Sequence, residues 1–204
     1  MKSFLQIIAI LCCFTNFAQE TVTTSFQKAE SIKPLRIGAR LGTPSIITAN
    51  VEYVTPLLDN RVAATLDYMS LSKTVDDVSI RYNNFEIGTN VYLNNTGKGL
   101  YGSLTYFSFK SNGTFTDVDF DDFTTEDGEA QINFNTVNLK VGAKLGRVFY
   151  FRAEVGYGFG KIPERILVES TESNKTTFED IPAIPGIGKS GALIFNIGIG
   201  FSFL

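Results

Sequence analysis

The chain has 204 residues, of which 44% are hydrophobic and 19% charged, so it is long and apolar enough for one sizeable domain. Its formal net charge of −3 gives no basis for nucleic-acid binding, which depends on basic surfaces that neutralise phosphates. Histidine is absent, which excludes Ser-His and His-Asp hydrolytic centres, so we do not expect an enzyme.

Residues 1–18 have the composition of a cleaved secretory signal. Lys2 supplies the positive start, an apolar stretch follows, and Ala18 is a small residue at the expected cleavage site. The apolar stretch is shorter than the roughly 20 residues that a membrane-spanning helix needs. Both cysteines leave with this signal, so the exported chain has no thiol or disulfide. We expect a periplasmic lead over residues 19–33.

From residue 34 onward, apolar and polar residues alternate with a period of two, and no stretch has a convincing helical period. This alternation predicts about eight strands. In chain order, the predicted strands cover residues 35–41, 47–53, 62–68, 85–93, 100–109, 137–145, 149–159 and 191–204. The alternation slips near Tyr106 and Phe107, where we expect a β-bulge.

The predicted connections differ in length on the two sides of the sheet. Three of them are short: TPLLDN, NNTGKG and the pair Gly146-Arg147. The connections on the other side lengthen along the chain, from TPS through SKTVDDVS to residues 110–136 and residues 161–190. Bacterial outer-membrane barrels have this asymmetry, with short periplasmic turns and longer extracellular loops.

The polar face of the predicted strands carries glycines together with charges of both signs. Glycine costs about 0.5–1 kcal/mol of backbone entropy in a strand, but in a narrow interior it makes room for the long arginine or lysine side chain of a neighbour. Buried charges need partners of opposite sign. We therefore place this face inside a lumen and the apolar face against lipid. The predicted internal charge network consists of Arg36, Arg40, Glu52, Asp67, Glu86, Lys140, Lys144, Arg152 and Glu154.

These features resemble the small bacterial outer-membrane β-barrels of the OmpA/OmpX type, in particular the PorT-like outer membrane protein beta-barrel domain family. The resemblance covers residues 34–204 and rests on strand number, connection asymmetry and the terminal sequence IGIGFSFL. It implies an all-β, about eight-stranded, antiparallel up-and-down transmembrane β-barrel with a porin-like fold in the bacterial outer membrane. It also implies that Phe201 and Phe203 form a C-terminal signal for the barrel-insertion machinery, with Leu204 following them.

Residues 183–190, AIPGIGKS, differ at their first position from the phosphate-binding pattern G-x-x-x-x-G-K-S. A phosphate loop needs a buried strand before it and a helix after it. Here a polar stretch, SNKTTFEDIP, precedes the motif, and a glycine-punctuated strand follows it. We therefore expect no nucleotide site, and the sequence indicates no cofactor.

The acidic segment DVDFDDFTTEDGE raises the question of a metal. Asp117, Asp119 and Asp121 have the spacing that opens a calcium loop. The sixth position is an aspartate instead of glycine, and the twelfth is a glycine instead of glutamate, so half of the ligand pattern is missing. The better interpretation is a solvated acidic loop. An alternative places three phenylalanines, in or just before this segment, in a surface patch or an outer aromatic girdle: Phe115, Phe120 and Phe123.

An eight-stranded interior is just wide enough to be filled by side chains, so we expect a closed polar lumen and not a wide pore. The function would then be structural, or recognition through the long connections 110–136 and 161–190. The expected partners are outer-membrane lipid and other envelope proteins. Resemblance to PorT-like proteins also implies a role beside a secretion or assembly complex, by analogy of fold alone.

Two alternatives stay open at this point. A calcium-dependent surface adhesin would act through the acidic segment. A soluble, exported, lipocalin-like barrel would bind a small apolar ligand inside and expose Lys140 and Lys144. The cavity of that second alternative would be lined by Leu139, Val141, Ile197 and Ile199.

Overall fold

The computed structural model describes residues 32–75, 78–120, 124–181 and 186–203. The predicted signal peptide and most of the predicted periplasmic lead lie outside these residues. The described part of the chain is all-β and antiparallel, and it contains no helix long and apolar enough to span a membrane. The description below concerns the unit that begins at Ile32.

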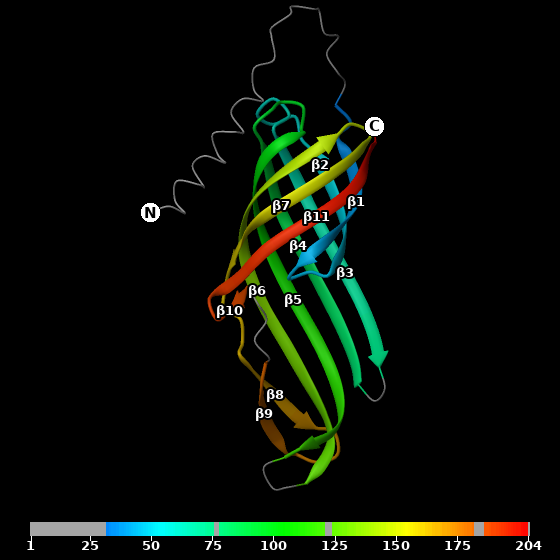
Figure 1. Cartoon of the computed structure of the whole chain (residues 1–204), viewed down its shortest axis with the longest axis vertical. Helices are drawn as coiled ribbons and strands as arrows, with labels where there is room; N and C mark the ends of the chain where they lie inside the picture. The colour runs from blue at the N-terminus through cyan, green and yellow to red at the C-terminus, as the bar shows by residue number, and fades with distance from the viewer. Residues whose placement is uncertain (1–31, 76–77, 121–123, 182–185, 204) are drawn as a thin grey trace, which may run out of the picture. The chain divides into compact units, whose positions relative to one another are not determined.

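Eight strands pair in sequence to form a closed ring (Figure 1). They are β1 (Leu35–Thr43), β2 (Ile47–Val54), β3 (Val62–Val75), β4 (Val78–Tyr92), β5 (Gly99–Asp119), β6 (Thr125–Gly146), β7 (Phe149–Phe159) and β11 (Gly191–Phe203). The ring closes because β11 pairs with β7 on one side and with β1 on the other. The prediction of an eight-stranded antiparallel arrangement is therefore confirmed.

Three further strands lie between β7 and β11 in the sequence: β8 (Arg165–Ser170), β9 (Thr176–Asp180) and β10 (Ile187–Gly188). Strand β8 pairs with the first part of β6, and β9 pairs with β8. The prediction that residues 161–190 form a long loop is therefore wrong where these residues form β8, β9 and β10. The short β10 pairs with the start of β11.

The longest strands of the ring continue beyond it (Figure 1). The ladder between β2 and β3 ends at Tyr68, and the ladder between β6 and β7 ends at Val137. The pairing of β3 with β4, β4 with β5 and β5 with β6 continues past these points. We call this part, together with β8 and β9, the extension; its ring-strand segments are residues 69–75, 78–84, 107–119 and 125–136.

The predicted connection over residues 110–136 is thus mostly strand and not loop. Its residues pair across β5 and β6 with only one irregularity, a register shift between Phe115 and Val118. The bulge predicted near Tyr106 and Phe107 is wrong, because the register with both neighbouring strands is continuous there. The slip in the sequence has a different cause, described below.

The three short connections join the strands at the end of the ring where β1 begins and β11 ends. There Leu35 is paired with Phe203. Apolar side chains fill the interior at this end, where Ile32 packs against the buried cluster Val54, Ala63, Tyr92 and Tyr101. The interior is therefore sealed from this side by side chains.

Candidate functional site: the charged interior and the two faces of the sheet

The interior of the ring carries the nine charged residues that the sequence placed there. Each of them is at most 7% exposed. They come from β1, β2, β3, β4, β6 and β7, always on the face that alternates with the apolar outer residues. Strands β5 and β11 contribute neutral polar groups instead, among them Tyr101, Thr105 and Asn196.

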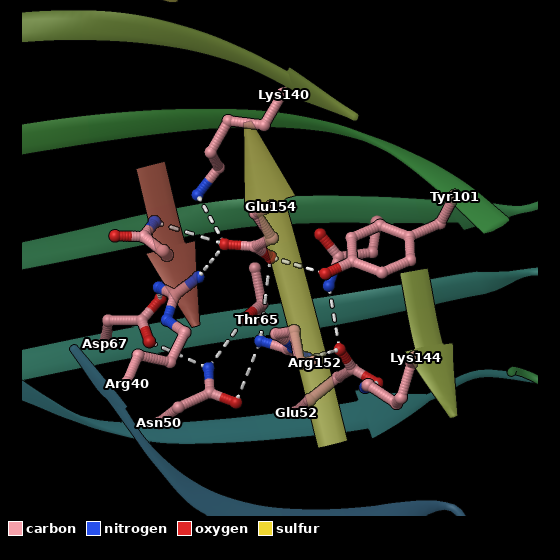
Figure 2. Close-up of polar contacts among 12 residues, drawn as sticks. Arg40, Asn50, Glu52, Thr65, Asp67, Tyr101, Lys140, Lys144, Arg152 and Glu154 are labelled. Atoms are coloured by element: carbon pink, nitrogen blue, oxygen red, sulfur yellow. Dashed lines mark hydrogen bonds and ion pairs between the residues drawn. The ribbon is translucent and has the colours of Figure 1, made fainter. Parts of the chain in front are cut away.

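Glu52 on β2 is the centre of the layer nearest the short turns, and Figure 2 shows it beside Arg152 and Lys144. Three cationic and two neutral groups donate to its carboxylate. They are Arg36 Nη1 at 2.7 Å, Arg152 Nη2 at 2.5 Å, Asn90 Nδ2 at 2.7 Å, Tyr92 Oη at 2.8 Å and Lys144 Nζ. Glu52 is fully buried, so these donors take the place of its hydration.

Arg40 on β1 organises the next layer, farther from the turns (Figure 2). Its guanidinium contacts Asp67, lies 2.7 Å from Glu154 and 3.3 Å from Glu86. Lys140 adds a second cation, with Nζ at 2.7 Å from Glu86 and 3.8 Å from Glu154. Each of these two glutamates is therefore neutralised by more than one base.

Neutral groups complete the hydrogen bonding of this layer. Tyr101 donates to Glu154 at 2.6 Å, and Asn196 donates to the same carboxylate at 3.2 Å. Asn138 donates to Glu86 at 2.9 Å, and the Thr105 hydroxyl also donates to it. These partners share the sequence parity of the charges, so the same alternation that located the charges could have located them.

Arg152 links the two layers. Besides Glu52, it donates to Asn50 Oδ1 at 3.1 Å and lies 3.8 Å from Glu154. Asn50 passes the link on through its amide, which donates to Asp67 at 2.8 Å. The charged interior is therefore one connected network. Such networks are stable only when nearly all members are paired, because an isolated buried charge is costly.

Glycines let the aromatic side chains of the network lie flat across the interior. A Cβ added to Gly200 would lie 2.4 Å from the Tyr150 hydroxyl, and one added to Gly38 would lie 2.8 Å from it. Likewise, a Cβ on Gly142 would lie 2.6 Å from the ring of Tyr101. The sequence predicted that glycines on this face make room for long basic side chains. That holds at Gly156, where an added Cβ would lie 2.7 Å from Lys140, and at Gly198, where it would lie 2.9 Å from Arg40. The tyrosine neighbours were not predicted.

The network is also covered toward the extension. A cavity of about 10 Å³ lies at that end, which is about the space of one water molecule. Phe107 and Ile194, both nearly fully buried, form its apolar wall. The polar residues around it are Arg40, Thr48, Glu86, Asn138 and Asn196, with the β1–β2 turn residues Thr43, Pro44 and Ser45.

The outer face of the ring is apolar. Leu139, Val141, Ile197 and Ile199 are between 39% and 63% exposed there. The lipocalin-like alternative required these four inside and two lysines outside, and the structure has the opposite arrangement. A depression of about 480 Å³ interrupts this face where small residues lie on adjacent strands, at Gly102, Ala143 and Ala153.

Aromatic residues lie at both ends of the apolar outer face. We call those beside the short turns the turn-side band: Tyr53, Phe149, Phe201 and Phe203. We call those beside the extension the extension-side band: Tyr68, Phe85, Tyr106, Tyr157 and Phe159. The two residues of the predicted C-terminal signal thus belong to the turn-side band, where Phe201 packs edge-on against Phe149.

In the extension the polarity of the two faces is exchanged. The face continuous with the charged interior becomes apolar, with Phe109 stacked on Phe134 at 4.8 Å between ring centroids and Phe107 next to both. The face continuous with the apolar exterior becomes polar. Its residues include Ser70, Ser72, Arg81, Asn83, Lys110, Asn112, Gln131, Asn133 and Asn135. This exchange explains the slip that the sequence shows at Tyr106 and Phe107.

The acidic segment forms the far end of β5 and the start of β6. Asp117 is exposed and has a left-handed backbone with φ of 56°, beside the register shift, and Asp119 accepts a hydrogen bond from Thr125 at 3.2 Å. Asp121 and Phe123 lie outside the described residues. Within those residues, no cluster of acidic or sulfur ligands could hold a metal ion. Phe120 is buried, so the prediction that it lies in a surface patch or girdle is wrong.

The glycine-rich motif lies partly in the described residues. Its last part forms β10 and the turn into β11, and no helix follows it. Lys189 lies 2.6 Å from Glu164 in an exposed ion pair. This context differs from the helix N-terminus that a phosphate loop requires.

No protein-family model matches the chain, and no curated protein matches its sequence. Two solved structures, CarO and CarO2 of Acinetobacter baumannii, are similar to it in fold. CarO is 15% identical with a TM-score of 0.46, and CarO2 is 12% identical with a TM-score of 0.44. In both cases the match covers 83% of this chain and 98% of the other.

Proposed function

We propose that the chain is an integral β-barrel of the bacterial outer membrane, with a closed, ion-paired lumen. The observation that carries this proposal is the polarity of the ring, whose buried face is charged and whose exposed face is apolar. A solvated protein has the opposite arrangement, because exposed apolar area of this extent drives association. Lipid removes that cost.

The dimensions of the outer face support the same proposal. On β7 the outward apolar row runs from Phe149 to Phe159, and on β11 from Leu193 to Phe203. Eleven residues extend about 33 Å along a strand, or about 25 Å along the barrel axis at a tilt of about 40°. That height is the apolar band of outer-membrane barrels, which aromatic girdles border as the two aromatic bands do here. The depression at Gly102 would then hold a lipid chain.

The orientation follows from the connections. The start of β1, the end of β11 and the short turns lie on one side of the ring, which we assign to the periplasm. The extension then projects from the cell surface. We propose a structural or recognition role without catalysis, in which the extension, including its β8–β9 hairpin, contacts other envelope proteins.

The first test is the gel mobility of membrane-extracted protein, heated against unheated, with cell fractionation beside it. A closed barrel has no free strand edge within the membrane and resists detergent until boiled. A heat-dependent band in the outer-membrane fraction is the expected result. A single band in the soluble fraction would overturn the proposal.

A second test labels lysines in the folded, detergent-solubilised protein. Lys140 and Lys144 are 4% and 2% exposed, whereas Lys110 is exposed. An amine-reactive reagent should modify Lys110 rapidly and the two interior lysines only after boiling. Rapid modification of the interior lysines before boiling would contradict the closed lumen.

A further inference from the structure

We infer that the outer face of the extension holds the phosphate of an anionic glycolipid headgroup, through Arg81 on β4 and Lys110 on β5. This inference rests on the proposed membrane location and names a lipid class that the surface recognises. It is carried by three observations: the depth of the two bases, their free charges and the amides around them.

The depth follows from strand register. Arg81 lies four residues beyond Phe85 along β4, and Lys110 four residues beyond Tyr106 along β5, both on the outward face. Four residues span about 13 Å along a strand, or about 10 Å along the barrel axis when the strands are tilted by about 40°. Headgroups occupy roughly 5–8 Å on each side of the hydrocarbon. Long basic side chains lean back toward that interface, which brings both charges to the depth of lipid phosphates.

The two bases are diagonal neighbours on adjacent strands. Arg81 is opposite Asn112, and Lys110 is two residues before Asn112 on the same strand. Diagonal positions lie about 7–8 Å apart, so two long side chains can reach one phosphate. Both residues are exposed, and neither side chain makes an ion pair or hydrogen bond within the described residues.

The surroundings of this pair suit an anion. Lys110 lies between Asn83 of β4 and Asn133 of β6, so amide donors flank the bases on both sides. A phosphate would accept charge-assisted hydrogen bonds from the guanidinium and the ammonium, and further bonds from these amides. On the outer face of the described strands, the nearest carboxylate is that of Glu129, which is opposite Thr114 and thus farther from the membrane.

The position favours a lipid over a free phosphate ion as the source of the anion. An exposed pair of bases in water holds an inorganic ion weakly, because salt screens it. A lipid also buries its acyl chains against the apolar outer face directly below, and a basic group near an anionic membrane surface strengthens binding several-fold. The two contributions act on one molecule.

The experiment measures retention of a phosphorylated glycolipid. The full chain is reconstituted in phosphatidylcholine nanodiscs that contain either monophosphoryl lipid A or its dephosphorylated form, and bound glycolipid is counted by native mass spectrometry. Three proteins are compared: the wild type, the Arg81→Gln/Lys110→Gln variant, and Lys73→Gln. Lys73 is an exposed base at the same level, one strand away, on the opposite face of the extension, so it is a matched control.

The wild type and Lys73→Gln should retain the phosphorylated lipid, and the double variant should bind it about ten- to thirtyfold more weakly. The three proteins should retain the dephosphorylated lipid equally. Equal retention by the double variant, or an equal loss in Lys73→Gln, would overturn the inference, as would full competition by millimolar inorganic phosphate. The heat-dependent band is recorded for every protein. If every protein gives the band and the double variant retains the lipid as the wild type does, only this inference fails. If the wild type gives no heat-dependent band, the proposed membrane location fails.

Discussion

Tyr106 and Phe107 are consecutive residues of β5 that point to opposite faces of the sheet, the first 43% exposed and the second 1% exposed. Below them, toward the short turns, the inner face of β5 carries Ser103 and Thr105, and above them it carries Phe109 in an aromatic cluster. The two residues therefore mark the level at which the sheet exchanges its polar and apolar faces. The pairing of β5 with β4 and β6 is continuous across that level, so the same strands have opposite polarity on its two sides.

Arginine placed on the outer face should test this exchange directly. We expect Val141→Arg, in the middle of the apolar outer face, to reduce folding stability in lipid vesicles by about 2–4 kcal/mol, because the charge would face hydrocarbon. The matched change, Asn133→Arg, lies on the outer face of the same strand in the extension and should be within about 0.5 kcal/mol of the wild type. Urea titration in vesicles measures both. Equal losses would mean that lipid does not contact Val141.

Removal of the Glu52 carboxylate should destabilise the barrel strongly. Glu52→Ala leaves Arg36, Lys144 and Arg152 without their shared partner, and a broken buried ion pair costs about 3–5 kcal/mol. The temperature at which the heat-dependent gel band disappears should fall accordingly. The control is Glu172→Gln in the exposed β8–β9 turn, for which we expect no change. A Glu52→Ala variant that melts with the wild type would show that water compensates the three cations.

Two glycines of the ring should respond differently to a methyl group, because one faces the interior and the other faces outward. Gly200→Ala would place a Cβ 2.4 Å from the Tyr150 hydroxyl and 2.5 Å from the Ile37 carbonyl oxygen, so we expect a loss of about 1–3 kcal/mol. Gly102→Ala faces outward with nothing within 4 Å of the new Cβ, and it should be neutral or slightly stabilising. Urea titration in vesicles again gives the comparison. The order of the two variants is the critical result.

The hairpin of β8 and β9 should open at low pH. Hydrogen bonds from Lys175, Ser170 and Ser173 lower the pKa of Glu126 from 4.5 to about 2. Because the folded pKa is the lower one, the stabilisation is complete above pH 4.5 and is lost as pH falls toward 2. Amide hydrogen exchange of the turn, corrected for the intrinsic rate, should therefore accelerate over this interval.

The matched variant for this titration is Glu126→Gln, which keeps the size of the side chain and removes the charge. Its turn should exchange faster at neutral pH, and the corrected rate should no longer change between pH 5 and pH 2. If the wild-type rate also stays constant over that interval, the carboxylate of Glu126 does not hold the hairpin.

The ring could be predicted from sequence because its strands obey one rule over their whole length. From Val137 to Leu145 every outward residue is apolar or alanine, while Asn138, Lys140 and Lys144 face inward. Most glycines of the ring strands lie on the same face as the charges, which indicates that this face is the inner one. The inner tyrosines and amides followed the same parity, but polar neutral residues are compatible with either face, so they gave no signal of their own.

The extension could not be predicted by the same rule, because its alternation has the opposite polarity. In the sequence QINFN, Ile132 and Phe134 continue the inward face, although the ring would require polar residues there. If the polarity of the ring is assumed for the whole chain, the alternation of apolar and polar residues breaks here, and the sequence therefore predicts a loop. The contacts that decide the question are non-local: the ring of Phe134 stacks on Phe109 of β5, and Val168 of β8 is paired with Ala130.

The pairing of Leu35 with Phe203 has a kinetic consequence. Strands β2 to β7 can each form beside the strand made just before, through short hairpins, and such local pairing is fast. The contact of β1 with β11 joins the two ends of the domain, and the entropy of closing that loop is the largest of any pair in the ring. During folding, therefore, the sheet would exist as an open ribbon with two unpaired margins until its final 13-residue strand pairs. The time spent as that ribbon, and not the stability of the finished ring, would set how much the chain depends on helpers that keep its margins from meeting those of another molecule.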